Sequence, residues 1–305
     1  MLTRRQALGV FGMTAAASMV QGAEGKPAGY IDAHSHIWTR DLAKYPLDGK
    51  QTVDDLKPAS FTTEELLELA GKNGVGRVVL IQHKPYHGLD NSYITDSIAK
   101  YPGRFSGVAC IEADQAHPEH DMDKMFQLGM RGFRIRPGEG GKDQWKDSAG
   151  MCAMWAHAAK QGSAICPLID VTDLPQVEAM CQKYPDTTVV IDHFARLGVT
   201  GTVDEAALKT LTAFAKRKHV YVKISAFYAL GAKKPPHTEL IPMIRTMIDA
   251  YGVERLMWGS DSPYQIVAPN TYADSVKLIT ERCDFLSAQE RDHLLRGTAE
   301  KVFFS

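Results

Sequence analysis

Short apolar segments rich in β-branched residues recur along the chain, and longer segments with helical spacing separate them. Eight such segments span residues 29–36, 76–82, 105–111, 130–136, 163–169, 187–193, 220–226 and 255–261. Between them, apolar residues at intervals of three and four predict amphipathic helices, for example over 62–74, 122–130, 153–162 and 238–252. This alternation predicts repeated strand–helix units around a parallel sheet.

Eight units in about 280 residues predict a single-domain α/β fold, the (β/α)8 TIM barrel, over residues 27–305. An open doubly wound sheet usually has fewer strands and often a glycine-rich phosphate turn, and no G-x-G-x-x-G follows any predicted strand. The segments after the first and last strands, 37–60 and 262–270, are long or contain proline. Such loops build the active site at the C-terminal face of a barrel.

The first 26 residues differ in character from the rest of the chain. Arg4 and Arg5 precede a weakly apolar stretch rich in Ala, Gly and Met, followed by small residues and a polar tract. The pattern predicts an export signal of the twin-arginine type, with the twin-arginine machinery as a partner and a periplasmic or secreted location. A general secretory peptide and an amphipathic helix are the alternatives. The apolar stretch is short for a membrane span.

Composition narrows the choice of partners. The chain carries 35 Lys and Arg against 36 Asp and Glu, and 44% of its residues are hydrophobic, as in soluble globular proteins. This balance predicts no nucleic-acid or anionic-membrane surface. Five cysteines without a C-x-x-C pair predict neither a disulfide framework nor a zinc knuckle, although one bridge stays open. Whether the chain forms a homo-oligomer is also left open.

Polar residues at the predicted strand ends point to a metal centre. His34 and His36 alternate in the first strand, so their side chains share a face. His193 ends the sixth strand and Asp261 the eighth, so all four meet at the barrel mouth. Three imidazoles and a carboxylate suit one divalent ion, zinc first or manganese, with room for water and substrate. Asp261 and His193 are the predicted catalytic residues. Taken singly, each has an ordinary structural explanation, such as a helix N-cap for Asp261.

Substrate-binding candidates lie in other loops and strands. Arg134 and Arg136 share one face of the fourth strand, and their guanidinium groups should turn inward. Arg136 is the preferred anion binder, whereas an internal salt bridge is an equal alternative for Arg134. Arg196 is a second candidate. His83, after the second strand, is a candidate hydrogen-bond partner for a substrate carbonyl or hydroxyl, with a solvated loop histidine as the commoner alternative.

Two further features of the chain stay undecided at this level. Lys223 alternates with apolar residues in the seventh strand and can point inward or outward. Aromatic residues that follow strand ends can form a wall of the pocket or anchor loops; they are Trp38, Tyr86, Phe227, Tyr228 and Tyr264.

Five segments, IDAHSHIW, GFRIRP, VVIDHFAR, VYVKISAFY and LMWGSDSPY, carry a family resemblance. The chain resembles the amidohydrolase superfamily, in particular its amidohydrolase-related group of sugar-lactone and dicarboxylate-lactone hydrolases. The resemblance implies that His34, His36, His193 and Asp261 take the places of the family's site residues. Asp170 stands where many members carry a histidine ligand, so a two-metal site is not expected. Some similar lactonases act without a metal, their site residues binding substrate and activating water directly.

The resulting hypothesis is an exported, mononuclear metal-dependent hydrolase that opens a lactone or similar cyclic ester of a small hydroxylated or carboxylated compound. One alternative is a non-oxidative decarboxylase, because relatives in the wider group hold an acidic substrate at a similar site. A second alternative is a non-catalytic periplasmic binding protein. Nothing in the spacing of the residues separates C–O from C–N cleavage.

Overall fold

The computed structural model describes residues 29–49 and 51–305. The predicted export signal over residues 1–26 lies outside these residues and stays a prediction. Within the described part of the chain, no helix combines the length and apolar character that a membrane span requires. All five cysteines are free thiols, so the open possibility of a disulfide bridge is not realised.

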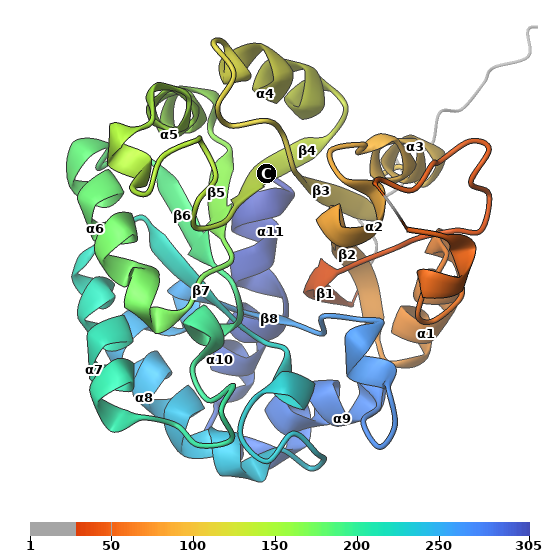
Figure 1. Ribbon diagram of the computed structural model, residues 1–305. Coiled ribbons are helices and arrows are strands. Elements are labelled where there is room, and N and C mark those ends of the chain that lie inside the picture. The colour runs from red at the N-terminus through yellow and green to blue at the C-terminus, as the bar shows by residue number, and fades with distance from the viewer. Residues whose placement is uncertain (1–28, 50) are drawn as a thin grey trace, which may run out of the picture.

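Eight parallel strands form the centre of the molecule in sequence order, as predicted (Figure 1). They are β1 (Tyr30–Ser35), β2 (Val75–Ile81), β3 (Phe105–Ala109), β4 (Met130–Ile135), β5 (Ala164–Pro167), β6 (Thr188–Ile191), β7 (Val220–Ser225) and β8 (Leu256–Gly259). The ring closes where Ser35 pairs with Ser262 and where the His36 N–H donates to the Ser262 carbonyl at 2.7 Å. The predicted TIM barrel is therefore confirmed.

Most of the helices surround the strands on the outside of the barrel, whereas the last helix lies across the centre of the ring in this view (Figure 1). The helices are α1 (Thr63–Lys72), α2 (Lys84–His87), α3 (Ser92–Lys100), α4 (Pro118–Gln127), α5 (Ala149–Gln161), α6 (Leu174–Lys183), α7 (Glu205–Ala213), α8 (Ile241–Tyr251), α9 (Tyr272–Lys277), α10 (Ala288–Asp292) and the last one, α11 (Thr298–Phe303). The boundaries predicted for 122–130 were wrong at both ends. Proline suits the first turn of a helix, so α4 begins at Pro118, and it ends before Met130 because that residue opens β4.

Two apolar layers hold the barrel together. The larger layer lies between the strands and the outer helices. The smaller one fills the barrel interior, where Ala299 and Phe303 of α11 pack against inward-facing residues near the strand starts, such as Ile31 and Tyr221. The last helix therefore covers the end of the barrel opposite to the carboxyl ends of the strands, and the mouth is left for the polar residues.

Candidate functional site

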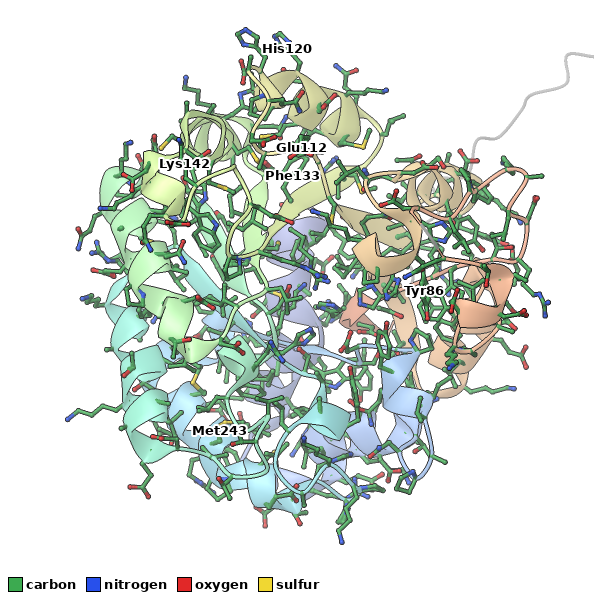
Figure 2. All side chains as sticks on the ribbon, viewed as in Figure 1. Tyr86, Glu112, His120, Phe133, Lys142 and Met243 are labelled. Atoms are coloured by element: carbon green, nitrogen blue, oxygen red, sulfur yellow. The ribbon has the colours of Figure 1, made fainter. Side chains whose placement is uncertain are left out.

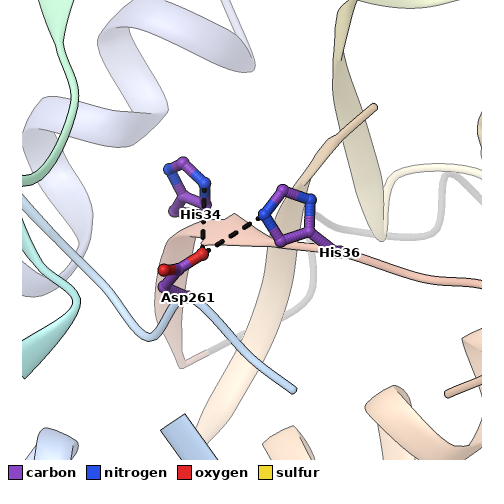
Figure 3. Close-up of side chains that lie close together, drawn as sticks. All are labelled: His34, His36 and Asp261. Carbon is purple, nitrogen blue, oxygen red and sulfur yellow. Dashed lines mark ion pairs between the residues drawn. The ribbon is translucent and has the colours of Figure 1, made fainter. Parts of the chain in front are cut away.

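The first and last strands bring three polar side chains together at the mouth. His34 lies in β1, His36 follows its end, and Asp261 lies two residues past β8. Both imidazoles face one carboxylate oxygen (Figure 3): Asp261 Oδ1 is 3.5 Å from His34 Nε2 and 3.2 Å from His36 Nε2. His193 joins them from the end of β6, with Nε2 3.8 Å from Asp261 Oδ2. The structure thus gathers all four residues that the sequence analysis assigned to the mouth, and all four are buried.

Unusual backbone conformations position two of these side chains. Residues 193–196 all have φ between 50° and 56°, and Asp261 has φ 62°. A left-handed conformation costs a non-glycine residue roughly 1–2 kcal/mol. Hydrogen bonds hold it in place, because the Ala195 N–H donates to the Asp192 carbonyl at 2.9 Å and the Asp261 N–H to the His34 carbonyl at 2.8 Å. The predicted sixth and eighth strands consequently stop two residues early, since an extended strand cannot include these residues.

Two histidines are oriented through their Nδ1 atoms. His36 Nδ1 donates to the Ile81 carbonyl at 2.8 Å, and its Nε2 faces Asp261. His193 Nδ1 shares a hydrogen bond of 2.8 Å with Ser225 Oγ. Burial lowers the pKa of His193, so its imidazole is neutral near pH 7. Partners of this kind fix the tautomer and the ring orientation of a metal-binding histidine.

A buried charge network lies beneath His34. Asp192 accepts a hydrogen bond from Arg134 Nη2 at 2.8 Å, and its Oδ1 is 3.1 Å from Lys223 Nζ and 3.3 Å from His34 Nδ1. Arg134 Nη2 also donates to His34 Nε2 at 2.9 Å. Burial alone would raise the pKa of Asp192, but Lys223 and Arg134 outweigh burial and hold that pKa well below its usual range. Lys223 therefore points inward, and Arg134 has the internal salt bridge that the sequence left as an alternative.

Three of the four central residues, His36, His193 and Asp261, line a pocket of about 260 Å³. Three arginines, Arg134, Arg136 and Arg196, bring positive charge to its lining. The rest of the wall combines Gln82, His83 and two tyrosines with apolar side chains, namely Pro85, Leu168, Val199, Ala226, Ala229 and Leu230. The four predicted substrate-binding residues all line this pocket.

The two outer arginines, Arg136 and Arg196, differ in whether a carboxylate pairs with their guanidinium group. Arg196 pairs with Asp170 at 3.2 Å, and both side chains are about half exposed, at 45% and 51%. Arg136 is half-buried, and in the described part of the chain its guanidinium makes no ion pair or hydrogen bond. The neighbouring carboxylate, Glu139, pairs with Lys84 at 2.6 Å instead. Arg136 is therefore the guanidinium with room for an anion.

His83 is buried, which contradicts the commoner expectation of a solvated loop histidine. Its Nε2 shares a hydrogen bond of 2.5 Å with the Tyr264 hydroxyl. The centroid of its ring lies 5.0 Å from the ring centroid of Trp38 and 4.2 Å from that of Tyr86. Burial lowers the pKa of His83 to about 2, so it is neutral. Of the five predicted wall residues, Tyr228 and Tyr264 line the pocket, Trp38 and Tyr86 support His83, and Phe227 is buried in the core.

The sequence analysis missed two interactions at this site. Tyr228 donates its hydroxyl to Asp261 Oδ2 at 2.8 Å, although it was considered only as an aromatic wall residue. Asp192 was included in the sixth predicted strand without a role. A carboxylate inside an otherwise apolar strand segment, VVIDHF, is a signal for a buried ion pair that sequence inspection can use.

The residues at the mouth can hold one metal ion. The ligand atoms of His34, His36 and Asp261 all lie within 4.8 Å of one another. Asp170 takes no part, because it pairs with Arg196. Among the described residues, Asp170 belongs to neither of the side-chain groups that could hold a metal ion.

Comparisons with known proteins cover nearly the whole barrel. Residues 31–304 match the family model described as Amidohydrolase. A 4-sulfomuconolactone hydrolase from Hydrogenophaga intermedia is 26% identical over 248 residues, which cover 78% of this chain and 76% of the relative. An L-fucono-1,5-lactonase from Burkholderia ambifaria is 26% identical over 280 residues, 88% of this chain and 93% of the relative. A solved structure from Pseudomonas putida, described as a candidate 2-pyrone-4,6-dicarboxylic acid hydrolase, is similar with a TM-score of 0.75 and 26% identity over 91% of this chain and 98% of that chain.

Proposed function

The chain belongs to the amidohydrolase family, and we propose that it hydrolyses a lactone or similar cyclic ester of a small carboxylated molecule. The observation that carries this proposal is the convergence of His34, His36, His193 and Asp261 beside a pocket that contains three arginines. Relatives named as 4-sulfomuconolactone hydrolase and L-fucono-1,5-lactonase support the opening of a cyclic ester.

We propose one divalent ion as cofactor, zinc first and manganese second. The donor set fits because His36 and His193 use their Nδ1 atoms for protein partners and present Nε2 toward Asp261. Asp261 supplies the carboxylate, and His34 completes the set once its Nε2 is released from Arg134. When bound, the ion supplies Lewis acidity, which polarises a carbonyl group and makes a water molecule more acidic.

Asp261 is the proposed base. Burial alone would raise the pKa of Asp261, but His193, His36 and His34 outweigh it and hold that pKa well below its usual range. The side chain is therefore a carboxylate at neutral pH and can accept a proton from the attacking water. Tyr228 donates to Oδ2 and fixes the carboxylate plane. His193 is neutral and its Nε2 lies 3.8 Å from Asp261, so in a site without the ion this nitrogen can pass the proton on to the leaving oxygen. In the metal-bound site Nε2 serves as a ligand, and Asp261 itself returns the proton.

The pocket arginines bind the other end of the substrate. The unpaired guanidinium of Arg136 supplies charge-assisted hydrogen bonds to a carboxylate. Arg196 is the second anion contact at the rim. Water adds to the lactone carbonyl, the ring C–O bond breaks, and the ring oxygen leaves as a hydroxyl after protonation. The product is a hydroxy acid, and its new carboxyl group releases one proton near pH 7.

A pH-indicator assay on the purified chain tests this proposal. The panel consists of carboxylated pyrones and muconolactones, a sugar lactone, and a carboxylated lactam. Ester opening releases one proton per turnover without gas, whereas carbon dioxide release with proton uptake supports a decarboxylase. Asp261→Asn retains the Tyr228 contact and should lower kcat by about 10²-fold or more. Ligand binding without turnover, unchanged in this variant, would contradict the proposal and indicate a binding protein.

Chelation tests the metal component separately. If activity falls after chelator treatment and returns with zinc, the ion takes part in the reaction. Unchanged activity in a protein shown by elemental analysis to be metal-free would remove the ion from the proposal and leave hydrolysis in place.

A further inference from the structure

A second group of metal-ligating side chains lies at the start of α4, outside the mouth. It consists of His117, Glu119 and His120, whose ligand atoms all lie within 4.8 Å of one another. Figure 2 shows His120 at the outer edge of the molecule, on the helix that follows β3. We propose that these three residues, called the α4 site below, bind Zn²⁺ or a similar borderline divalent ion. This proposal shares no residue with the proposed active site.

The geometry of the α4 site needs little change to accept zinc. Tetrahedral zinc with bonds of 2.0–2.1 Å places its donor atoms about 3.3 Å apart. His117 Nδ1 and Glu119 Oε1 are already 3.0 Å apart. The rings of His117 and His120 are stacked, with centroids 5.3 Å apart and planes 21° from parallel. Because the His117 and His120 side chains are exposed, small rotations can bring the donor atoms together without disturbing the core.

The carboxylate provides an independent indication that a ligand is missing from the cluster. Glu119 Oε1 faces His117, whereas Oε2 is buried and forms no hydrogen bond to another residue in the described part of the chain. A buried carboxylate oxygen without a partner is unfavourable. A simple pair between His117 and Glu119 satisfies neither this oxygen nor His120. One cation in contact with all three side chains satisfies both.

The local chain also limits the cost of binding. Pro118 lies between two of the ligands, is buried, and has its φ fixed by its ring, so the backbone between His117 and Glu119 is preorganised. The N-terminal end of a helix repels a cation. In α4 the acidic residues of the first turn, Glu119 and Asp121, oppose that effect. A His₂Glu set is also a ligand combination that zinc uses in proteins.

Counting bound zinc in the purified chain tests the α4 site. The double variant His117→Gln/His120→Gln is compared with wild type and with His219→Gln, which removes an exposed histidine elsewhere. After equilibrium dialysis against Zn²⁺, wild type and the control should each bind one ion per chain more than the double variant. Each single variant should weaken this binding at least about tenfold. Equal zinc content in wild type and double variant would overturn the proposal.

Copper supplies a readout that identifies the ligands. Loaded with two Cu²⁺ ions per chain, wild type should show two components in its electron paramagnetic resonance spectrum, one from the mouth and one from the α4 site that is coupled to two imidazole nitrogens. The double variant should lose only the component from the α4 site. An unchanged spectrum would also overturn the site. Neither measurement uses turnover, so both hold even if the chain hydrolyses no lactone. If the site is real, two metal ions per chain do not indicate a binuclear centre at the mouth.

Discussion

Replacing Lys223 by methionine tests the buried charges beneath His34. Lys223 and Asp192 are fully buried, and their charged atoms lie 3.1 Å apart. Methionine keeps most of the length of the lysine stem and removes only the charge and its hydrogen bonds. Asp192 retains its second cation, Arg134, at 2.8 Å. The variant therefore removes one of two partners from a carboxylate that cannot reach water.

The expected loss of free energy of unfolding depends on how many of the buried charges keep a partner of opposite charge. Breaking a buried ion pair by removing one partner costs about 3–5 kcal/mol. Because Arg134 still neutralises Asp192, Lys223→Met should lower the free energy of unfolding by less, about 2–3 kcal/mol. Asp192→Asn leaves two buried cations without their carboxylate and should cost about 5 kcal/mol. Combining Lys223→Met with Asp192→Asn should cost about 2 kcal/mol less than the sum of the two single effects, since both remove the same contact.

Urea unfolding followed by tryptophan fluorescence measures these differences. Lys216→Met is the matched control, because this lysine is 63% exposed and its pair with Glu178 is long, at 3.5 Å. It should change the free energy of unfolding by less than about 0.5 kcal/mol. The reasoning is refuted if Lys223→Met costs no more than the control, or if the effects of Lys223→Met and Asp192→Asn simply add.

Three other changes test separate parts of the structure. Arg136→Met should lower kcat/KM for a carboxylated lactone by about 10- to 150-fold, because a charge-assisted hydrogen bond contributes about 1.5–3 kcal/mol. The same variant should have little effect on an uncharged lactone. Equal losses on both substrates would contradict an anion-binding role. The pKa of His83 is about 2 in the folded chain, against an ordinary 6.5, so the unfolded chain takes up the proton first as the pH falls. Wild type should therefore lose about 2 kcal/mol of stability between pH 6.5 and 5 through this residue, and urea titrations at both pH values should show a shallower loss in His83→Gln. Ala195→Gly should leave the melting temperature nearly unchanged, because relief of left-handed strain offsets the lost methyl group, whereas Ala158→Gly within α5 should cost about 1 kcal/mol or more.

The barrel and the gathering of the four mouth residues could be predicted because both follow from short-range patterns. The strand segments are rich in apolar residues, as in the segment around β6 (Thr188–Ile191), and all strands of a parallel barrel end at one face. Histidine and aspartate at those ends therefore meet, however far apart they are along the chain. Helix boundaries were less accurate, since the start of α4 depends on Pro118 rather than on apolar spacing.

The environments of the same residues could not be predicted, because they depend on contacts between remote segments. The partner of Arg134, Asp192, lies 58 positions further along the chain. His83 is buried by Tyr264, 181 positions away, so its loop position alone suggested solvent exposure. The left-handed turn at 193–196 contains no glycine, and its sequence therefore gave no sign of positive φ.

The position of one guanidinium separates the two mechanisms that the sequence left open. A neutral imidazole whose Nδ1–H faces Asp192 has a single lone pair on Nε2, and Arg134 Nη2 uses that lone pair of His34 at 2.9 Å. Arg134 and a metal ion cannot both use it. Asp192 accepts a hydrogen bond from the same guanidinium at 2.8 Å, so Arg134 keeps a buried partner when its contact with His34 is given up. A metal-dependent and a metal-independent site can therefore share the same four mouth residues and differ chiefly in whether Arg134 or the ion engages His34.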